Sequence, residues 1–298
     1  MTTTSRSGIG GLPPWSLTVV AMLSAQLGAA LSMDIIGTIG PGGAAWLRLS
    51  FGGLIFLAIA RPRFREIARR DYPALLGLGV ATGLMSMSFM FAIERIPLGT
   101  CVAIEFLGPL VVAAVQSGTR RALLWPGLAL VGVVLLTEPW QGSVDAVGIG
   151  FAVLGAICWG TYIMLTQHVG DRFEGITGLA VTIPIAALTT AVVGIPEAIG
   201  HISLGVIVAS LILALLFPVA TFALEMLALS RMTHNAFGTL MALEPGIGLA
   251  LGLIVLHQKP TLIQLIGILL VVAGGAAAQR GGLREPDEAD VALPYPPG

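Results

Sequence analysis

Long apolar runs recur along this chain from near its beginning almost to its end. A helix that spans ~30 Å of hydrocarbon needs about 17 to 25 residues, and ten runs have about this length. They lie at 15–34, 41–60, 73–93, 98–117, 122–138, 145–166, 175–195, 203–227, 235–256 and 261–279. The pattern predicts ten transmembrane helices.

Composition supports a membrane protein of the helical kind. The 298 residues are 56% hydrophobic and only 10% charged, and they include 39 glycines. A chain of this composition has more apolar surface than a soluble fold of this size can bury. Backbone polar groups in lipid must be satisfied internally, and the runs are too long and too uniformly apolar for barrel strands. We therefore expect an all-α membrane protein, in which the prolines inside the runs mark irregular places.

The distribution of positive charge predicts the orientation. Of the 15 Lys and Arg residues, Arg48 lies inside the second run. If the N-terminus is cytoplasmic, Arg95 and Lys259 fall on the outer side and the remaining twelve fall inside. Because cytoplasmic loops are enriched in Lys and Arg, we expect both termini to be cytoplasmic and the protein to lie in the bacterial inner membrane.

The two ends of the chain differ from the apolar body. Residues 1–14 form a short cytoplasmic N-terminal segment, and we expect no signal cleavage because the first run has a counterpart inside the chain. Residues 281–298 are acidic and proline-rich, which is typical of a disordered cytoplasmic tail. The two cysteines, Cys101 and Cys158, lie in apolar runs and are interpreted as small core residues.

An internal repeat divides the body into two halves. Residues 92–109 match residues 228–245 at a constant shift of 136, with Ala, Arg, Leu and Pro in common. Residues 23–25 match 154–156 at a shift of 131, and Gly132 matches Gly267 at 135. This predicts two five-helix repeats, 15–139 and 140–280. Since five is odd, the second repeat enters the membrane from the opposite side, as in many secondary transporters.

Three glutamates, Glu105, Glu225 and Glu244, lie inside apolar runs, where a charge is unfavourable and usually functional. Pro109 follows Glu105 by four residues, so its ring removes the hydrogen bond to the Glu105 carbonyl. Pro245 directly follows Glu244 and frees a carbonyl one helical turn earlier. A carboxylate beside a free carbonyl is a suitable ligand for a cation or an ammonium group. The alternative is that each glutamate is only paired with a buried donor such as Arg48.

Other polar and aromatic positions have two interpretations each. Glu225 lies towards the cytoplasmic end of its run, so it either belongs to the site or reaches the interface. Arg48 requires an acidic or carbonyl partner, in a structural ion pair or in contact with substrate. Trp159 and Tyr162 share one face of the sixth run, and Gln26 lies on the first. These side chains either line a cavity or serve as packing.

Several function classes are disfavoured by absent motifs. The chain has no HExxH, GxSxG or GxGD pattern and no P-loop, so we expect neither an intramembrane enzyme nor a pump with its own ATPase site. Its histidines are not grouped with Cys or carboxylates, so no metal site is predicted. A channel remains an alternative to a carrier at this point.

The segments ERIPLGTCVAIEFLGPL, FALEMLALSRM and LMALEPGIGLALGL, with the pair Trp159–Gly160, resemble the drug/metabolite transporter superfamily. They are most similar to EamA-type exporters of the threonine/homoserine efflux branch, and the resemblance covers residues 15–280. It implies a ten-helix inner-membrane carrier that exports small amino acids by exchange with protons. The motif positions it carries over are Glu105, Pro109, Glu225, Glu244 and Pro245.

A mechanism can be stated as a hypothesis. A zwitterionic amino acid places its ammonium on a carboxylate and a freed carbonyl, while its carboxylate meets a helix terminus or Arg48. Protonation of the glutamate then releases the cargo. The expected partners are this cargo, protons and membrane lipid, without nucleic acid or a cofactor, and the oligomeric state stays open. The main alternative is export of another small metabolite or a drug-like cation.

Overall fold

A computed structural model describes residues 13–62, 69–116, 120–141, 145–169, 176–232 and 234–281. Within these ranges every regular element is a helix and there is no strand, which confirms the predicted all-α class. Most of the predicted N-terminal segment, residues 1–12, and the predicted tail from residue 282 onward lie outside the described residues.

Eight helical stretches in the described part of the chain are long and apolar enough to cross a membrane. They are Pro14–Ala60, Tyr72–Ile93, Leu98–Gln116, Arg120–Gln141, Ala146–Thr166, Ile176–Ala198, Leu204–Leu229 and Ala236–Ile254. A further apolar helix, Leu262–Ala278, is shorter. Large apolar side chains such as Leu188 and Val192 are 71% and 77% exposed, as expected for a surface that faces lipid. The chain is therefore a multi-pass membrane protein.

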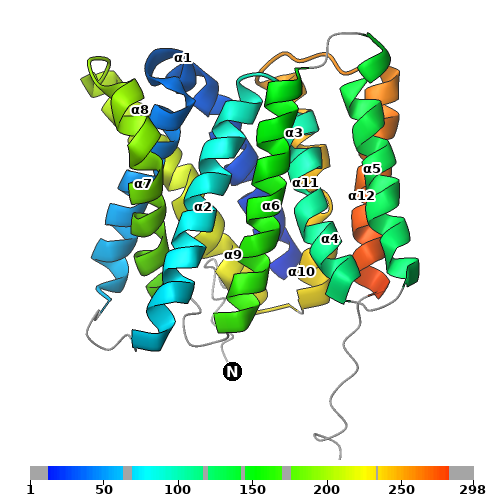
Figure 1. Ribbon diagram of the computed structural model, residues 1–298, viewed down its shortest axis with the longest axis horizontal. Coiled ribbons are helices and arrows are strands. Elements are labelled where there is room, and N and C mark those ends of the chain that lie inside the picture. Colours follow the sequence, from blue (N-terminus) through cyan, green and yellow to red (C-terminus); the bar gives the residue numbers. More distant parts are fainter. Residues whose placement is uncertain are drawn as a thin grey trace, which may run out of the picture.

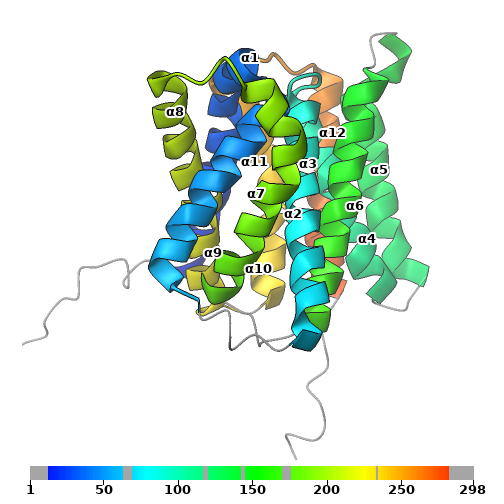
Figure 2. The same cartoon turned by 60° about the vertical axis from the view of Figure 1, so that its left-hand side comes forward.

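The first element, α1 (Pro14–Ala60), is 47 residues long, which would measure roughly 70 Å as a straight helix. It is broken at Gly40, where φ is 76° and ψ is 163°, and Pro41 follows. A positive φ of this kind is open to glycine and strained for other residues. Figure 2 shows the chain turning back at this point, so that α1 forms two antiparallel stretches.

The remaining helices follow as an alternating up-and-down bundle (Figure 1). They are α2 (Tyr72–Ile93), α3 (Leu98–Glu105), α4 (Leu107–Gln116), α5 (Leu124–Thr137), α6 (Ala146–Val169), α7 (Ile176–Ala198), α8 (Leu204–Ala214), α9 (Thr221–Leu229), α10 (His234–Met241), α11 (Glu244–Ile254) and α12 (Leu262–Gly281).

Three of the membrane-crossing stretches are interrupted near a proline. The α3/α4 stretch breaks at Phe106, and the α10/α11 stretch breaks just before Glu244. Between α8 and α9 the segment Leu215–Ala220 is wound more widely, and Phe217 has non-helical angles. Proline has no backbone N–H, so it cannot donate the regular helical hydrogen bond to the carbonyl four residues earlier. These three interruptions therefore have the same local cause.

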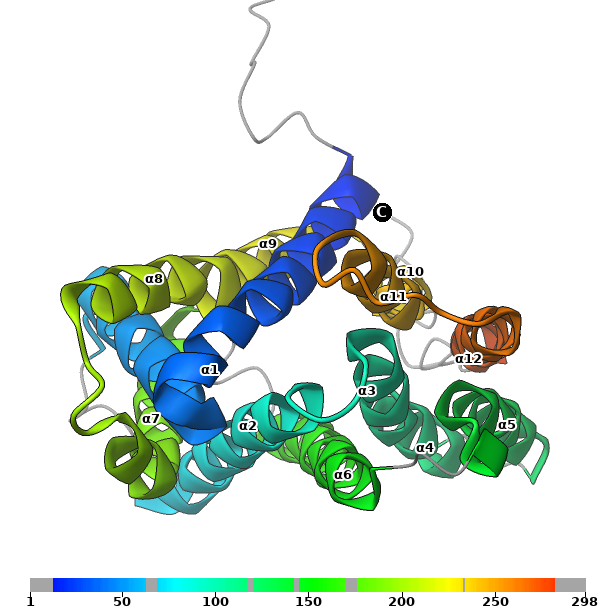
Figure 3. The ribbon, with the colours of Figure 1, turned by 90° about the horizontal axis from the view of Figure 1, so that it is seen from above.

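The interrupted stretches pack against neighbouring helices of the bundle. Viewed from above, α3 and α4 pack on α6, and α11 packs on α3 and on α1 (Figure 3). The irregular segment before α9 also packs on α1. At two of the breaks a charged side chain, Glu105 or Glu244, is buried in the bundle.

Candidate functional site

Glu105 is the last residue of α3 and is buried, with 7% exposure. Pro109 lies in the first turn of α4 and has no N–H to donate to the Glu105 carbonyl. The Oε1 atom of Glu105 has no hydrogen-bond partner among the described residues. The carboxylate therefore lies at a helix interruption with an acceptor atom that nothing in the described structure uses.

The Glu105 carboxylate rests against the backbone of α6. At Gly155 of that helix, an added Cβ atom would overlap Oε1 of Glu105. Cys101 on α3 and Cys158 on α6 lie within electrostatic reach of the same carboxylate. Both cysteines are buried and unpaired, in agreement with their interpretation as core residues.

Glu244 is the first residue of α11, followed by Pro245, and is also buried, with 9% exposure. Its Oε1 atom accepts a hydrogen bond from Nε2 of Gln26 on α1, at 3.1 Å. Oε2 of Glu244 and Oε1 of Gln26 are buried and have no partner among the described residues. A buried polar atom without a partner costs roughly 1–3 kcal/mol, so both atoms are suited to receive a ligand.

Arg48 lies in the second stretch of α1 and is 3% exposed. Its Nη2 donates to the hydroxyl of Ser86 on α2 at 2.7 Å, and its guanidinium lies 4.7 Å from the centre of the Phe217 ring. Nε has no partner, and no carboxylate in the described part of the chain is within ion-pair distance. The structure therefore shows no ion pair at bonding distance for Arg48 in the described residues. A hydroxyl and an aromatic face contact the guanidinium, and Glu105 lies within electrostatic reach of it.

Glu225 and the two aromatic residues of α6 are half-buried. Glu225 on α9 lies within electrostatic reach of Glu244 and of Tyr162. Trp159 packs edge-to-face on Phe106, with ring centres 6.3 Å apart. Trp159 thus packs beside the α3/α4 interruption, whereas Tyr162 lies on the Glu225 side of the bundle.

The structure brings the predicted charged residues into one cluster. Glu105 lies within electrostatic reach of both Arg48 and Glu244, and Glu244 within reach of Glu225. Four buried atoms here lack a partner in the described structure: Oε1 of Gln26, Oε1 of Glu105, Oε2 of Glu244 and Nε of Arg48. The cluster therefore offers three hydrogen-bond acceptors and one cationic donor.

Two residues of this cluster were missed by sequence reasoning. Ser86, the hydroxyl partner of Arg48, lies in an apolar run with no distinguishing pattern. Gly155 was part of the repeat match of 154–156 with 23–25, yet a glycine in a membrane helix carries no specific signal. Within the described residues there is no group of three His, Cys, Asp or Glu residues that could hold a metal ion.

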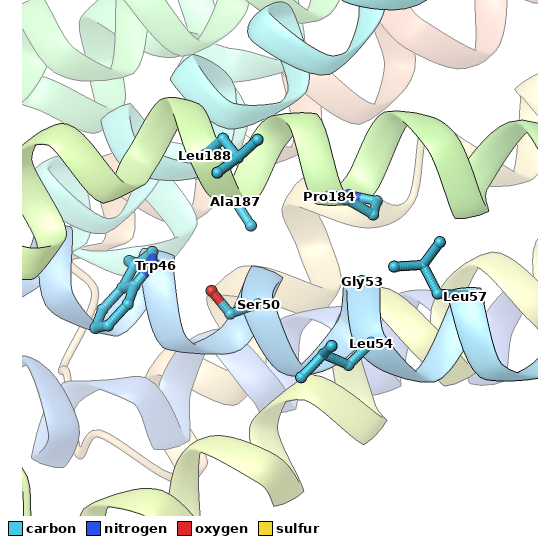
Figure 4. A pocket seen from close by; sticks show the side chains of 8 residues that line it. All are labelled: Trp46, Ser50, Gly53, Leu54, Leu57, Pro184, Ala187 and Leu188. Atoms are coloured by element: carbon cyan, nitrogen blue, oxygen red, sulfur yellow. The ribbon is translucent and has the colours of Figure 1, made fainter. Parts of the chain in front are cut away.

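An apolar pocket of about 260 Å³ lies elsewhere, between the second stretch of α1 and α7 (Figure 4). Leu54 and Leu188 at its edge are 62% and 71% exposed, so it opens to the outer surface of the bundle. None of the predicted site residues lines it; the lining residues are Trp46, Ser50, Gly53, Leu54, Leu57, Pro184, Ala187 and Leu188. Without a charged group, it is not suited to a zwitterionic or cationic cargo.

Comparison with known proteins gives consistent matches over the chain. The model of the EamA-like transporter family matches residues 146–277. The threonine/homoserine exporter RhtA of Escherichia coli (strain K12) is 35% identical over 274 residues, which cover 88% of this chain and 90% of that protein. RhtA of Salmonella typhimurium (strain SL1344) is 31% identical over 287 residues, covering 92% and 95%.

Two more distant matches concern a transporter and a fold. The uncharacterized transporter YvbV of Bacillus subtilis (strain 168) is 24% identical over 253 residues, covering 76% of this chain and 79% of that protein. A solved crystal structure has a TM-score of 0.59 at 18% identity and covers 90% of this chain and 97% of its own. At this identity the solved structure shows a shared fold alone.

Proposed function

Because this chain belongs to the drug/metabolite transporter superfamily, in the threonine/homoserine efflux branch of the EamA-like transporters, we propose that it exports small amino acids such as threonine and homoserine. The relatives are transporters, so the chain is a transporter and not an enzyme. The observation that carries the proposed substrate class is the buried cluster of three acceptors and one cationic donor.

The proposed architecture is ten membrane-spanning stretches arranged as two inverted repeats, 15–139 and 140–280. The turn at Gly40 divides α1 into two spans, and α12 is the tenth. A Cβ atom added to Gly132 would lie 2.5 Å from the carbonyl oxygen of Gly267, and one added to Gly267 would lie 2.7 Å from that of Gly132. Such reciprocal contact between matched residues is expected close to a two-fold axis, which supports the repeat.

The two acidic sites lie at matching helix breaks, although Glu105 itself aligns with Met241 and not with Glu244. Glu105, from the interrupted span of the first half, packs on α6, which is the first helix of the second half. Glu244, from the interrupted span of the second half, is bonded to Gln26 of α1, which is the first helix of the first half. Each half thus contributes one carboxylate that contacts the other half. A site between inverted halves is the place where alternating-access carriers bind their cargo.

The proposed location is the bacterial inner membrane, with both ends of the chain at the cytoplasmic face. The start of α1 and the end of α12 lie at the same face of the bundle (Figure 1). The α2–α3 and α11–α12 connections, which carry Arg95 and Lys259, lie at the opposite face. The excess of Lys and Arg on the first face supports its assignment as cytoplasmic.

In the proposed mechanism, the cargo's ammonium group binds at Glu105, Glu244 and Gln26. A primary ammonium has three N–H donors, and these three residues supply three buried acceptors without a partner. The positive charge of the ammonium also offsets the repulsion between the two carboxylates. We assign the cargo's carboxylate to Arg48, whose Nε atom lacks a partner. Glu225, Tyr162 and Trp159 then lie around the site without an assigned contact.

Proton exchange follows from the same carboxylates. Two carboxylates within electrostatic reach in a low-dielectric interior cannot both remain charged without a counter-charge. Arg48, within electrostatic reach of Glu105, offsets one of the two negative charges. A bound ammonium or a proton supplies the second positive charge, so the cargo and the proton compete for one site. A proton entering from the outside would therefore release the amino acid there, and the inward proton gradient would drive export.

The test is efflux of a panel of radiolabelled compounds from cells that overexpress the chain. We expect saturable efflux of threonine and homoserine. N-acetylthreonine, which lacks the ammonium, and threoninol, which lacks the carboxylate, should be poor substrates. Efflux of drug-like cations without any amino acid would refute the proposal and favour the alternative substrate class. Ohmic current in place of saturable counterflow would identify a channel.

A further inference from the structure

The two buried carboxylates are held in different ways. Glu244 accepts a hydrogen bond from Gln26, which fixes its direction. Glu105 has no such donor at Oε1, and this atom lies where a Cβ atom at Gly155 of α6 would be. The position of the Glu105 carboxylate therefore depends on van der Waals contact with α6, where Gly155 has no side chain and leaves room for it.

The fit between Glu105 and Gly155 is close. A Cβ atom at Gly155 would overlap Oε1 of Glu105 and would lie 2.9 Å from Cδ and 3.2 Å from Cγ of the same side chain. Any residue other than glycine here must displace the carboxylate. The neighbouring contact of Gly108 with the Ala156 carbonyl keeps α4 and α6 too close together for the carboxylate to be accommodated by helix separation.

We propose that Gly155 is a positioning residue for cargo binding, because its missing side chain forms the seat that holds the Glu105 carboxylate against α6. This rests on the proposed export function. Gly155 contacts the carboxylate and not the cargo, so it acts through Glu105. In this role it is the counterpart of Gln26, which positions the carboxylate of the other half.

Three glycines, Gly155, Gly108 and Gly150, allow an effect on the position of the carboxylate to be distinguished from an effect on helix packing. At Gly155 the obstructing atoms belong to the end of a flexible side chain, so the fold can accommodate alanine while the carboxylate moves. At Gly108 the obstructing atom is a backbone oxygen of Ala156, so alanine there must disturb the helices themselves. At Gly150, on α6 as well, nothing lies within 4 Å of an added Cβ.

The experiment compares Gly155→Ala, Gly150→Ala and Gly108→Ala in detergent and in proteoliposomes. Gly150→Ala is the matched control, since it makes the same change of residue in the same helix. We expect Gly155→Ala to unfold at the temperature of Gly150→Ala but to transport threonine with kcat/KM reduced about tenfold to a hundredfold, because small misplacements of binding groups have effects of this size. Gly108→Ala should lower the unfolding temperature.

A second-site variant provides the readout that a purely structural role would not change. Glu105→Asp shortens the side chain by one methylene and makes room for the added Cβ. We expect Glu105→Asp combined with Gly155→Ala to transport better than Gly155→Ala alone. The inference is overturned if Gly155→Ala transports like Gly150→Ala, or if the double variant gives no recovery. If the wild-type protein transports no amino acid at all, the proposed function fails instead.

Discussion

Replacing Gln26 with leucine removes the hydrogen bond that Glu244 accepts in the described part of the chain. The bond is 3.1 Å long, buried, and made to a charged group. Hydrogen bonds to charged groups contribute roughly 1.5–3 kcal/mol in soluble proteins, whereas those between membrane helices average about 0.6 kcal/mol. We therefore expect a loss of about 1–2 kcal/mol in cargo binding, which is about 5- to 30-fold in KM.

The assay is threonine uptake into proteoliposomes as a function of concentration, combined with thermal unfolding in detergent. Ser32→Ala is the matched control, because Ser32 is buried in the same helix. Its hydroxyl donates to the Gly28 carbonyl, one turn earlier in that helix, at 2.6 Å and not to Glu244. Gln26→Leu should raise KM, while Ser32→Ala should leave it unchanged. Leucine also removes Oε1 of Gln26, a proposed acceptor for the cargo's ammonium. A wild-type KM in Gln26→Leu would therefore refute both that contact and the role of this hydrogen bond in orienting Glu244.

Three further predictions concern stability, each measured by thermal unfolding in detergent. Gly132→Val should destabilise by about 1–3 kcal/mol through overpacking, whereas Gly127→Val, with nothing within 4 Å of an added Cβ, should not. Glu197→Ala should destabilise because two backbone amides at the turn of α1 lose their acceptor. The hydrogen bond from the Gly148 amide lowers the pKa of Asp145 from its ordinary value of 3.8, so the stabilisation by Asp145 is complete above that value and is lost as the pH falls through the lowered pKa. The difference between wild type and Asp145→Ala should therefore shrink at acidic pH.

The membrane-spanning stretches could be predicted because hydrocarbon imposes a length and an apolar composition on each of them. Some of the breaks were also predicted, since Pro109, Pro218 and Pro245 each lie at an interruption of a helix, whereas Pro184 lies inside the continuous helix α7. The burial of Glu105 and Glu244 followed from their place inside apolar runs. These features depend on a residue and its near neighbours in the chain.

The partners of the buried groups could not be predicted in the same way. In a membrane helix both the lipid-facing and the interior surface are apolar, so periodicity does not indicate which face points inwards. Gln26 and Glu244 are 218 positions apart, and their contact depends on how the two halves pack. Arg48 shows the limit clearly: the need for compensation was recognised, but the contacts of its guanidinium with Ser86 and Phe217 were not.

The most direct measurement is pH-gradient-driven threonine transport in proteoliposomes that contain Glu105→Gln or Glu244→Gln. Both variants keep the size of the side chain and remove its charge, so a change in transport reports the carboxylate itself. We predict that each variant loses gradient-driven transport. Transport at the wild-type rate in both variants would contradict the proposal that cargo and protons share these two carboxylates.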